Sequence, residues 1–208
     1  MRKRISYAIT VCNEAEQLNR LLALLQAYLK EGDEVVVQAD SEHVTDAVKQ
    51  VLANHATTVS KQVYYPLQMD FARFKNHLNE QCTGDFIFQL DADELPQTWL
   101  LEHLQDILSR HPWIELFKVP RINLFDQTLT PASIGASDGR VAWPDYQGRI
   151  YKNRPGRIRW HRPLHERIRG HLLYWHLPKD DRYALIHCKS LHQDTKKWNQ
   201  WKQAYAKN

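Results

Sequence analysis

The feature that most constrains the fold is an alternation of strand-like and helix-like segments along the first 110 residues. Four short apolar runs predict buried strands, at residues 5–12, 34–39, 57–65 and 85–90. The segments between and after them predict helices, at residues 14–30, 43–54, 69–82 and 97–110. Four repeats of a strand followed by a helix are typical of a parallel sheet covered on both faces, so the sequence predicts an α/β fold.

The second half of the chain has a different pattern. Strands are predicted at residues 113–125, 146–152 and 183–188, and a final helix at residues 194–206. A loop containing glycine and proline joins the first two of these strands, and residues 157–176 are basic and aromatic. No linker or repeat divides the chain, so we expect one domain, residues 1–208, made of two halves, 1–110 and 111–208.

Cysteine usage and apolar runs restrict the class of protein. The three cysteines are far apart and form no C-x-x-C motif, which argues against a disulfide framework and suits a reducing cytoplasm. The longest apolar-rich run, Leu21 to Leu29, is shorter than the ~20 residues of a membrane span. The chain also lacks the G-x-G-x-x-G, P-loop and H-E-x-x-H motifs. We therefore expect a cytoplasmic protein that is neither an NAD or ATP enzyme nor a zinc hydrolase.

An acidic motif follows the fourth predicted strand, where the sequence reads DFIFQLDADE. Ligands of parallel sheets bind beyond the carboxyl ends of the strands. Asp91 and Asp93 are two residues apart, so in extended backbone both project to one side. Two neighbouring carboxylates repel each other, and Mg²⁺ or Mn²⁺ shared with a diphosphate would relieve that repulsion. The alternative is a solvated acidic turn that assists the next helix.

These motifs together resemble family 2 glycosyltransferases of the GT-A fold. The features are TVCNEAEQL, Asp40, DFARFKNHLNEQCTGD and FIFQLDADE, followed more weakly by YQGRIYK, RPLHERIRG and LIHCKS. The chain is most similar to small bacterial members that build lipopolysaccharide cores. The resemblance implies an inverting sugar transfer from a nucleotide-sugar donor, with a UDP-sugar favoured, and a divalent cation. It also implies a nucleotide-sugar-binding half at 1–110 and an acceptor-side half at 111–208.

The resemblance also implies roles for residues near the ends of the first strands. They are expected to contact the donor, and they are Thr10, Asn13, Glu14, Asp40, Arg73, Asn76 and Asp91. Each has a simpler alternative: Asn13 and Glu14 could start a helix, Asp40 could cap one, and the basic helix residues could face solvent.

The second half is expected to supply the catalytic base and one further metal ligand. An inverting transfer needs a base for the acceptor hydroxyl, and Glu166 is the first choice, with Asp145 and His165 in reserve. The alternative for Glu166 is a structural ion pair with neighbouring arginines. His187 is expected to join Asp91 and Asp93 as a metal ligand, although a histidine at a strand end often has only a structural role.

The basic segment 149–170 and the tail KKWNQWKQAYAKN leave the acceptor open. A saccharide or a lipid-linked saccharide is favoured, and the tail would suit contact with an anionic membrane surface. Modified DNA is an alternative acceptor, and a non-catalytic module that binds nucleotide or nucleic acid is an alternative function.

Overall fold

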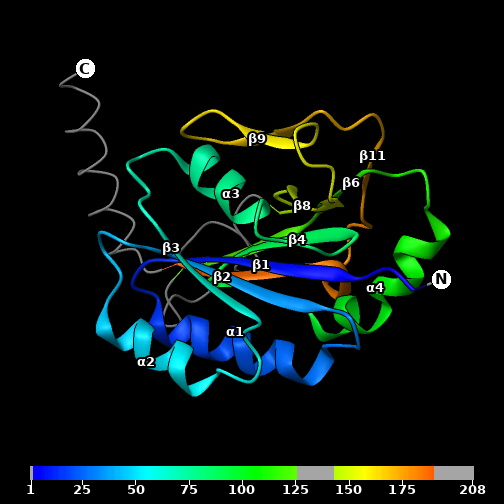
Figure 1. Ribbon diagram of the computed structural model, residues 1–208. Helices are drawn as coiled ribbons and strands as arrows, with labels where there is room; N and C mark the ends of the chain where they lie inside the picture. Colours follow the sequence, from blue (N-terminus) through cyan, green and yellow to red (C-terminus); the bar gives the residue numbers. More distant parts are fainter. Residues whose placement is uncertain (1, 126–142, 190–208) are drawn as a thin grey trace.

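A seven-stranded sheet forms the centre of the computed structural model, which describes residues 2–125 and 143–189 (Figure 1). Its strands lie in the order β11-β6-β8-β4-β1-β2-β3. Their bounds are β1 (Ile5–Val11), β2 (Glu34–Asp40), β3 (Lys61–Tyr65), β4 (Phe86–Asp91), β6 (Leu116–Val119), β8 (Gln147–Lys152) and β11 (Tyr174–His176). Strands β1 to β4 are mutually parallel, and β8 is antiparallel to β4 and β6. The mainly parallel α/β fold predicted from the sequence is confirmed.

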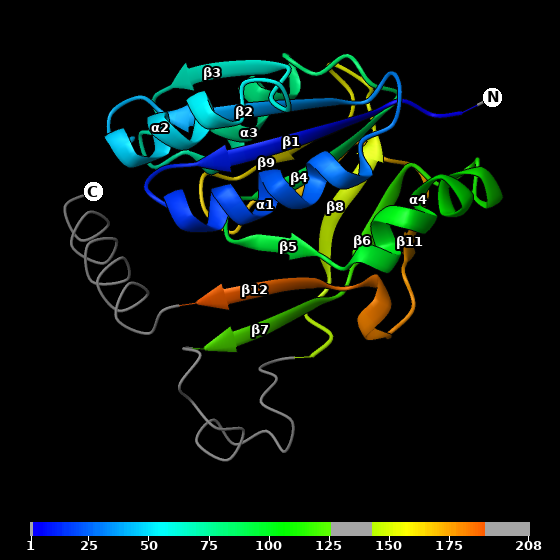
Figure 2. The same cartoon turned by 90° about the horizontal axis from the view of Figure 1, so that it is seen from below.

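Helices cover both faces of this sheet, above and below it in Figure 1, and Figure 2 shows the lower face. The helices α1 (Ala15–Tyr28), α2 (Asp46–Asn54) and α4 (Thr98–Arg110) contribute to one apolar cluster, with Tyr7 and Ile9 of β1. The helix α3 (Phe71–Asn79) packs on the other face, where Ala8 belongs to a second cluster. Because successive side chains of a strand point to opposite faces, β1 is buried on both sides, as its continuous apolar sequence predicts.

A two-stranded ribbon lies over α3. It consists of β9 (Arg159–His161) and β10 (Arg167–Arg169), which are antiparallel. Trp160 and Ile168 point inward and join the second apolar cluster. Asn76 fixes the ribbon to α3, because its side chain donates to the Trp160 carbonyl and accepts from the Trp160 N–H, both at 2.9 Å.

A smaller sheet of three strands stands beside the central one. Its order is β5-β12-β7, with β5 (Glu94–Pro96), β7 (Arg121–Phe125) and β12 (Leu185–Lys189), and a short 3-10 turn at Asp181–Tyr183 precedes β12. The single strand expected at 113–125 is therefore wrong, since it is divided into β6 and β7, which belong to different sheets. Pro120 lies between them and has no N–H for a strand ladder, so the chain leaves one sheet there and enters the other.

One predicted strand begins later than expected, and other predicted segments lie outside the described residues. The strand expected at 57–65 begins only at Lys61, because the N–H groups of Thr58 and Val59 both bond back to the His55 carbonyl in a turn that extends α2. The helix expected at 194–206 lies outside the described residues, as does most of the loop between 126 and 145. Within the described residues, no helix combines the length and apolar character that a membrane crossing requires.

Candidate functional site

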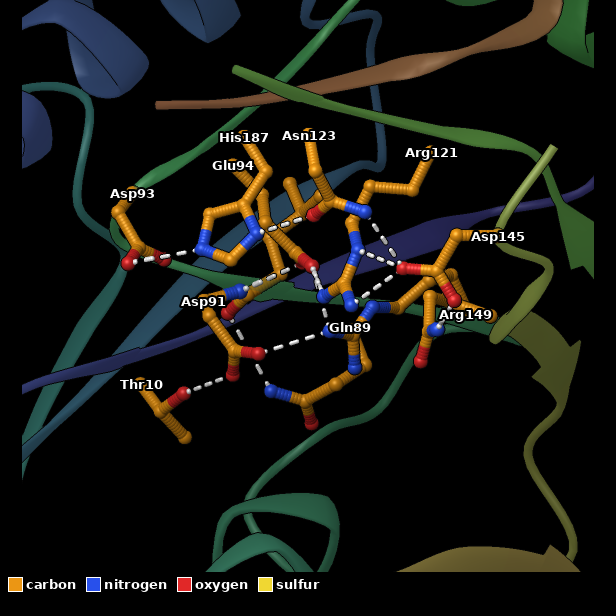
Figure 3. Close-up of polar contacts among 12 residues, drawn as sticks. Thr10, Gln89, Asp91, Asp93, Glu94, Arg121, Asn123, Asp145, Arg149 and His187 are labelled. Carbon is orange, nitrogen blue, oxygen red and sulfur yellow. Dashed lines mark hydrogen bonds and ion pairs between the residues drawn. The ribbon is translucent and has the colours of Figure 1, made fainter. Parts of the chain in front are cut away.

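The carboxyl ends of β1 and β4 bring Thr10 and Asp91 together. They are register neighbours, and the Thr10 hydroxyl donates to Asp91 Oδ1 at 2.8 Å (Figure 3). Strand β4 ends at Asp91, and a turn at Ala92 and Asp93 leads into β5. The expected extended backbone through Asp93 is therefore wrong. Because the chain turns, the carboxylates of Asp91 and Asp93 meet different partners.

Two cations hold the Asp91 carboxylate. Lys75 Nζ lies 3.1 Å from Asp91 Oδ1, and Arg149 Nη2 lies 2.7 Å from Asp91 Oδ2. Both cationic side chains are buried, with exposed fractions of 2% and 4%. Burial alone would raise the pKa of Asp91, but the charges of Lys75 and Arg149 and the hydroxyl of Thr10 outweigh it and hold that pKa well below its usual range.

Glu94 shares one of these cations. Its carboxylate is fully buried, and Oε1 accepts from Arg149 Nη2 at 2.6 Å and from Arg121 Nη1 at 2.9 Å. Burial opposes ionisation, yet the charge of Arg149, followed by that of Arg121, lowers the pKa of Glu94. Glu94 Oε2 also accepts from the backbone N–H of Asp91 at 3.2 Å, so the ion pairs and the turn stabilise each other.

These contacts correct part of the sequence argument. Repulsion among the acidic residues was expected to require a divalent cation, but the charges of Asp91 and Glu94 are compensated by Lys75, Arg121 and Arg149 from the chain itself. The acidic motif alone therefore does not establish a metal site. Its evidence has to come from the third carboxylate, which is Asp93.

Asp93 faces His187 on the neighbouring β12. The distance from Asp93 Oδ2 to His187 Nε2 is 3.2 Å. On the other side of the ring, His187 Nδ1 lies 2.9 Å from Asn123 Oδ1, and Asn123 Nδ2 donates to Asp145 Oδ2 at 2.8 Å. A carboxylate only accepts, so the amide must present its NH₂ to Asp145 and its oxygen to the ring. His187 Nδ1 therefore carries a proton.

When the imidazole is neutral, this order of donors leaves a lone pair on Nε2, directed at a carboxylate oxygen. Two acceptors at that distance attract each other only when a proton or a cation lies between them. An imidazole nitrogen and a carboxylate oxygen are also suitable ligands for a divalent metal, and a metal-binding histidine usually donates its other ring N–H to an acceptor, as His187 Nδ1 does to Asn123 Oδ1. Asp93 and His187 therefore fit a metal.

The third predicted ligand does not join them. Among the described residues, the only group of three whose ligand atoms lie within 4.8 Å of one another is Asp40, Glu42 and His43, after β2. Asp91 is held away because its oxygens already face Lys75 and Arg149. The structure thus presents two places for a cation, the pair at Asp93 and the group at Asp40.

Glu166 lies in the loop that joins β9 to β10, and its carboxylate pairs with Lys75 Nζ at 2.8 Å. The ammonium also lies 4.8 Å from the centre of the Trp160 ring. The expected arginine partners of Glu166 are thus replaced by a lysine that also holds Asp91. His165, a reserve candidate for the base, is exposed and has a positive φ of 51°.

Asp145, the other reserve candidate, is occupied by structural contacts. Its Oδ2 accepts from Arg121 Nε and Nη2 at 3.0 and 2.7 Å, in addition to Asn123, and Oδ1 accepts from Gln147 at 2.7 Å. Burial would raise the pKa of Asp145, but these hydrogen bonds and the Arg121 charge lower it. The geometry therefore favours Glu166 over Asp145 as a proton acceptor.

Two of the predicted donor-contact residues, Glu14 and Asp40, lie where β1 and β2 end. Glu14 Oε2 accepts from the N–H groups of Cys12 and Asn13 at 2.9 and 3.0 Å, which shapes the loop after β1. Asp40 is buried, and its Oδ1 accepts from the N–H groups of Glu42 and Leu67. It does not cap α2, whose N-cap is Thr45. The alternative of a capping role for Asp40 is therefore wrong.

Arg73 and Asn76 lie on a different side of α3 from Lys75. Arg73 Nη2 donates to Gln68 Oε1 at 2.7 Å, and its guanidinium lies 5.4 Å from the centre of the Tyr65 ring. Arg73 and Asn76 both line a cavity of about 400 Å³ between α3 and the ribbon. The structure does not bring them to the Asp91 carboxylate. The basic residue of α3 that contacts this carboxylate is Lys75.

Sequence reasoning missed the cations of the site. For Lys75 the sequence left open whether it faces the donor or solvent, and the structure shows it almost fully buried. Arg121 and Arg149 are 27 and 55 residues from Glu94, and no local pattern connects them. The usable signal was the general one that a carboxylate inside an apolar sheet requires a compensating charge.

Comparison with known proteins gives one family and several solved structures. The model of glycosyl transferase family 2 matches residues 6–193. A fragment of TarS from S. aureus, in complex with UDP-GlcNAc, is similar with a TM-score of 0.59 and 15% identity, over 89% of this chain and 58% of that chain. The mannosyltransferase PcManGT from Pyrobaculum calidifontis, in complex with GDP-Man and Mn²⁺, is 21% identical over 58% of this chain and 36% of that chain, with a TM-score of 0.49.

The likeness to TarS confirms the predicted GT-A fold. The chain spans little more than half the length of the TarS fragment and about a third of PcManGT. A search among proteins of curated function finds no match.

Proposed function

Because the chain belongs to glycosyl transferase family 2, we propose that it is an inverting, metal-dependent glycosyltransferase. It takes a hexosyl or pentosyl group from a nucleotide sugar, with a UDP-sugar favoured, and transfers it to a hydroxyl of a saccharide or lipid-linked saccharide. The observation that carries this proposal is the pairing of Asp93 with His187. The pair follows the end of a parallel strand, at Asp91, whose carboxylate is held by two buried cations. The UDP-GlcNAc held by the TarS fragment supports a UDP-sugar donor.

Asp93 and His187 are the residues that would hold the cation, with Asp91 nearby. A bound Mn²⁺ or Mg²⁺ would offset the negative charge that grows on the departing diphosphate. The contribution of the chain is orientation. Asn123 fixes the ring of His187 through Nδ1, and Asp145 in turn fixes the amide of Asn123.

Lys75 has the second organising role. Its ammonium contacts both Asp91 and Glu166, so one side chain of α3 sets the position of the donor-side carboxylate and of the proposed base. Glu166, with 18% of its side chain exposed, would accept the proton of the acceptor hydroxyl as its oxygen attacks the anomeric carbon. Thr10, Asn13, Glu14, Asp40, Arg73 and Asn76 remain predicted donor contacts.

The test is turnover of a panel of UDP-, GDP-, ADP- and CDP-sugars with and without Mn²⁺. We expect metal-dependent release of the nucleoside diphosphate from one donor class. The Asp93→Asn variant should lose that release. Asp46→Asn is the matched control, because its carboxylate lies on α2 and is almost fully exposed.

The Glu166→Gln variant separates the base from the donor site. It should keep binding of the nucleoside diphosphate and lose transfer by about 10²–10⁴-fold. Absence of turnover with every donor class would contradict the enzymatic proposal and favour a binding module. Full activity of Asp93→Asn would contradict the metal assignment alone.

A further inference from the structure

The basic segment 149–170 separates in the structure into inward and outward arginines. Arg149 is buried against Asp91 and Glu94, and Arg157 pairs with Glu115. These arginines are neutralised by the protein. Of the others, Arg154 is exposed outside the ribbon, and the rest are concentrated on the ribbon over α3 and in its loop: Arg159, Arg162, Arg167 and Arg169.

The outer face of the ribbon places like charges opposite each other. In the antiparallel register, Arg159 lies opposite Arg169, and His161 lies opposite Arg167. All four side chains are exposed, while the alternate residues point into the core. Like charges directly opposite on a strand pair are destabilising. In the described part of the chain, neither Arg159 nor Arg169 has a carboxylate within ion-pair distance to relieve this repulsion.

Arg159 of the ribbon and Arg162 of its loop also border a cavity. Arg159, His161 and Arg162 line one side of the space of about 400 Å³, and Arg73 and His77 of α3 line the other. The walls are held together by the paired hydrogen bonds of Asn76 to the Trp160 backbone. Arg162 has a positive φ of 75°, an uncommon conformation for a residue other than glycine. Asp70 and Glu80 also line the cavity, but three arginines outnumber these two carboxylates, so the concave surface carries an excess of positive charge.

The ribbon lies next to Glu166, the proposed base, in the chain. Glu166 comes directly before β10, four residues after Arg162, and Lys75 packs against Trp160 from the side of Asp91. The ribbon therefore adjoins the acceptor side of the site. Guanidinium groups in a planar fork match the oxygens of a phosphate better than those of a neutral sugar.

We propose that the β9–β10 ribbon and the cavity beneath it bind a phosphate group carried by the acceptor saccharide, next to Glu166. That this ligand is the acceptor rests on the proposed function, but the binding of a phosphate group does not depend on catalysis. The ligand relieves the repulsion between Arg159 and Arg169 by placing negative charge between them.

The probe is glucose 6-phosphate, with glucose as the uncharged control, titrated calorimetrically at low ionic strength. The protein should bind the phosphate ester and not glucose. The double variant Arg159→Gln/Arg169→Gln should bind at least tenfold more weakly, because a hydrogen bond between charged groups is lost with each arginine. Arg154→Gln, an exposed arginine of the same segment outside the ribbon, is the matched control and should bind as the parent does.

Two more measurements distinguish the explanations. If the arginines were structural, the double variant would melt at a lower temperature; relief of repulsion predicts an equal or higher one. Binding of UDP with Mn²⁺ should be the same in the double variant as in the parent protein. If the parent protein did not bind UDP with Mn²⁺, that result would contradict the proposed function but not this inference.

Failure of the parent protein to bind glucose 6-phosphate would overturn the proposal. So would a preference for vesicles of equal parts phosphatidylglycerol and phosphatidylcholine, or for a short single-stranded oligonucleotide, with the same arginine dependence. Those results would assign the ribbon to a membrane surface or to nucleic acid.

Discussion

Replacing Arg149 by methionine removes the cation that Asp91 and Glu94 share. The change keeps most of the side-chain volume, so the main effect is electrostatic. Glu94 is fully buried and keeps only Arg121, while Asp91 keeps Lys75. Removing one partner of a buried ion pair costs about 3–5 kcal/mol, because the remaining charge is left poorly compensated.

For a chain of this size, 1 kcal/mol corresponds to roughly 2–4 °C in melting temperature. The Arg149→Met variant should therefore melt roughly 6–20 °C below the parent in a calorimetric or circular-dichroism experiment. The control is Arg182→Met, whose guanidinium is 61% exposed and pairs with Asp180 at 2.8 Å. An exposed pair of this kind contributes about 0–1 kcal/mol, so its melting temperature should hardly change.

A double variant tests the cause. If the loss comes from the uncompensated charge of Glu94, then Arg149→Met combined with Glu94→Gln should melt above Arg149→Met alone, with a coupling of at least about 1 kcal/mol. Additive effects of the two changes, or a loss no larger than that of the exposed control, would refute the reasoning that Arg149 stabilises the fold by compensating the buried charge of Glu94.

The remaining predictions concern other parts of the molecule. Leu21→Ala on the buried face of α1 should cost about 2–5 kcal/mol in chemical denaturation, whereas Leu24→Ala, only partly buried, should cost clearly less; equal losses would contradict the assigned core face. Glu34 is partly buried, which opposes its ionisation, but donors from Ser6, Thr83 and Gly84 outweigh this and lower its pKa. Its contribution is therefore complete above its ordinary value near 4.5 and is lost as the pH falls through the lowered pKa. The stability difference between the parent and Glu34→Gln should shrink from pH 7 to pH 3, and a constant difference would show that the charge is not the cause.

Most of the fold could be predicted from the sequence because local patterns determine it. The leucine periodicity of α1 and the apolar runs of β1, β2 and β4 each follow from the requirement to bury one or both faces. The division of residues 113–125 could not be predicted from hydrophobicity, because both parts are apolar. Pro120 was the available signal, since it cannot donate within a ladder.

The site could be predicted only in part. Asp91 and Asp93 stand out because carboxylates follow an apolar strand, and His187 and Glu166 came from the family resemblance. Their partners depend on tertiary structure: Lys75 reaches Glu166 across 91 residues of sequence. Whether a carboxylate meets an ammonium group or a metal is decided by contacts between distant segments, which spacing does not show.

Binding of Mn²⁺ tests the central claim most directly. We would titrate Mn²⁺ in the presence of UDP and follow the free ion by electron paramagnetic resonance, comparing the parent with Asp93→Asn and with Glu42→Gln, which alters the other candidate group. The account predicts binding to the parent, at least about tenfold weaker binding to Asp93→Asn, and an unchanged affinity of Glu42→Gln. Unchanged binding by Asp93→Asn together with a loss in Glu42→Gln would contradict it and place the cation beside Asp40.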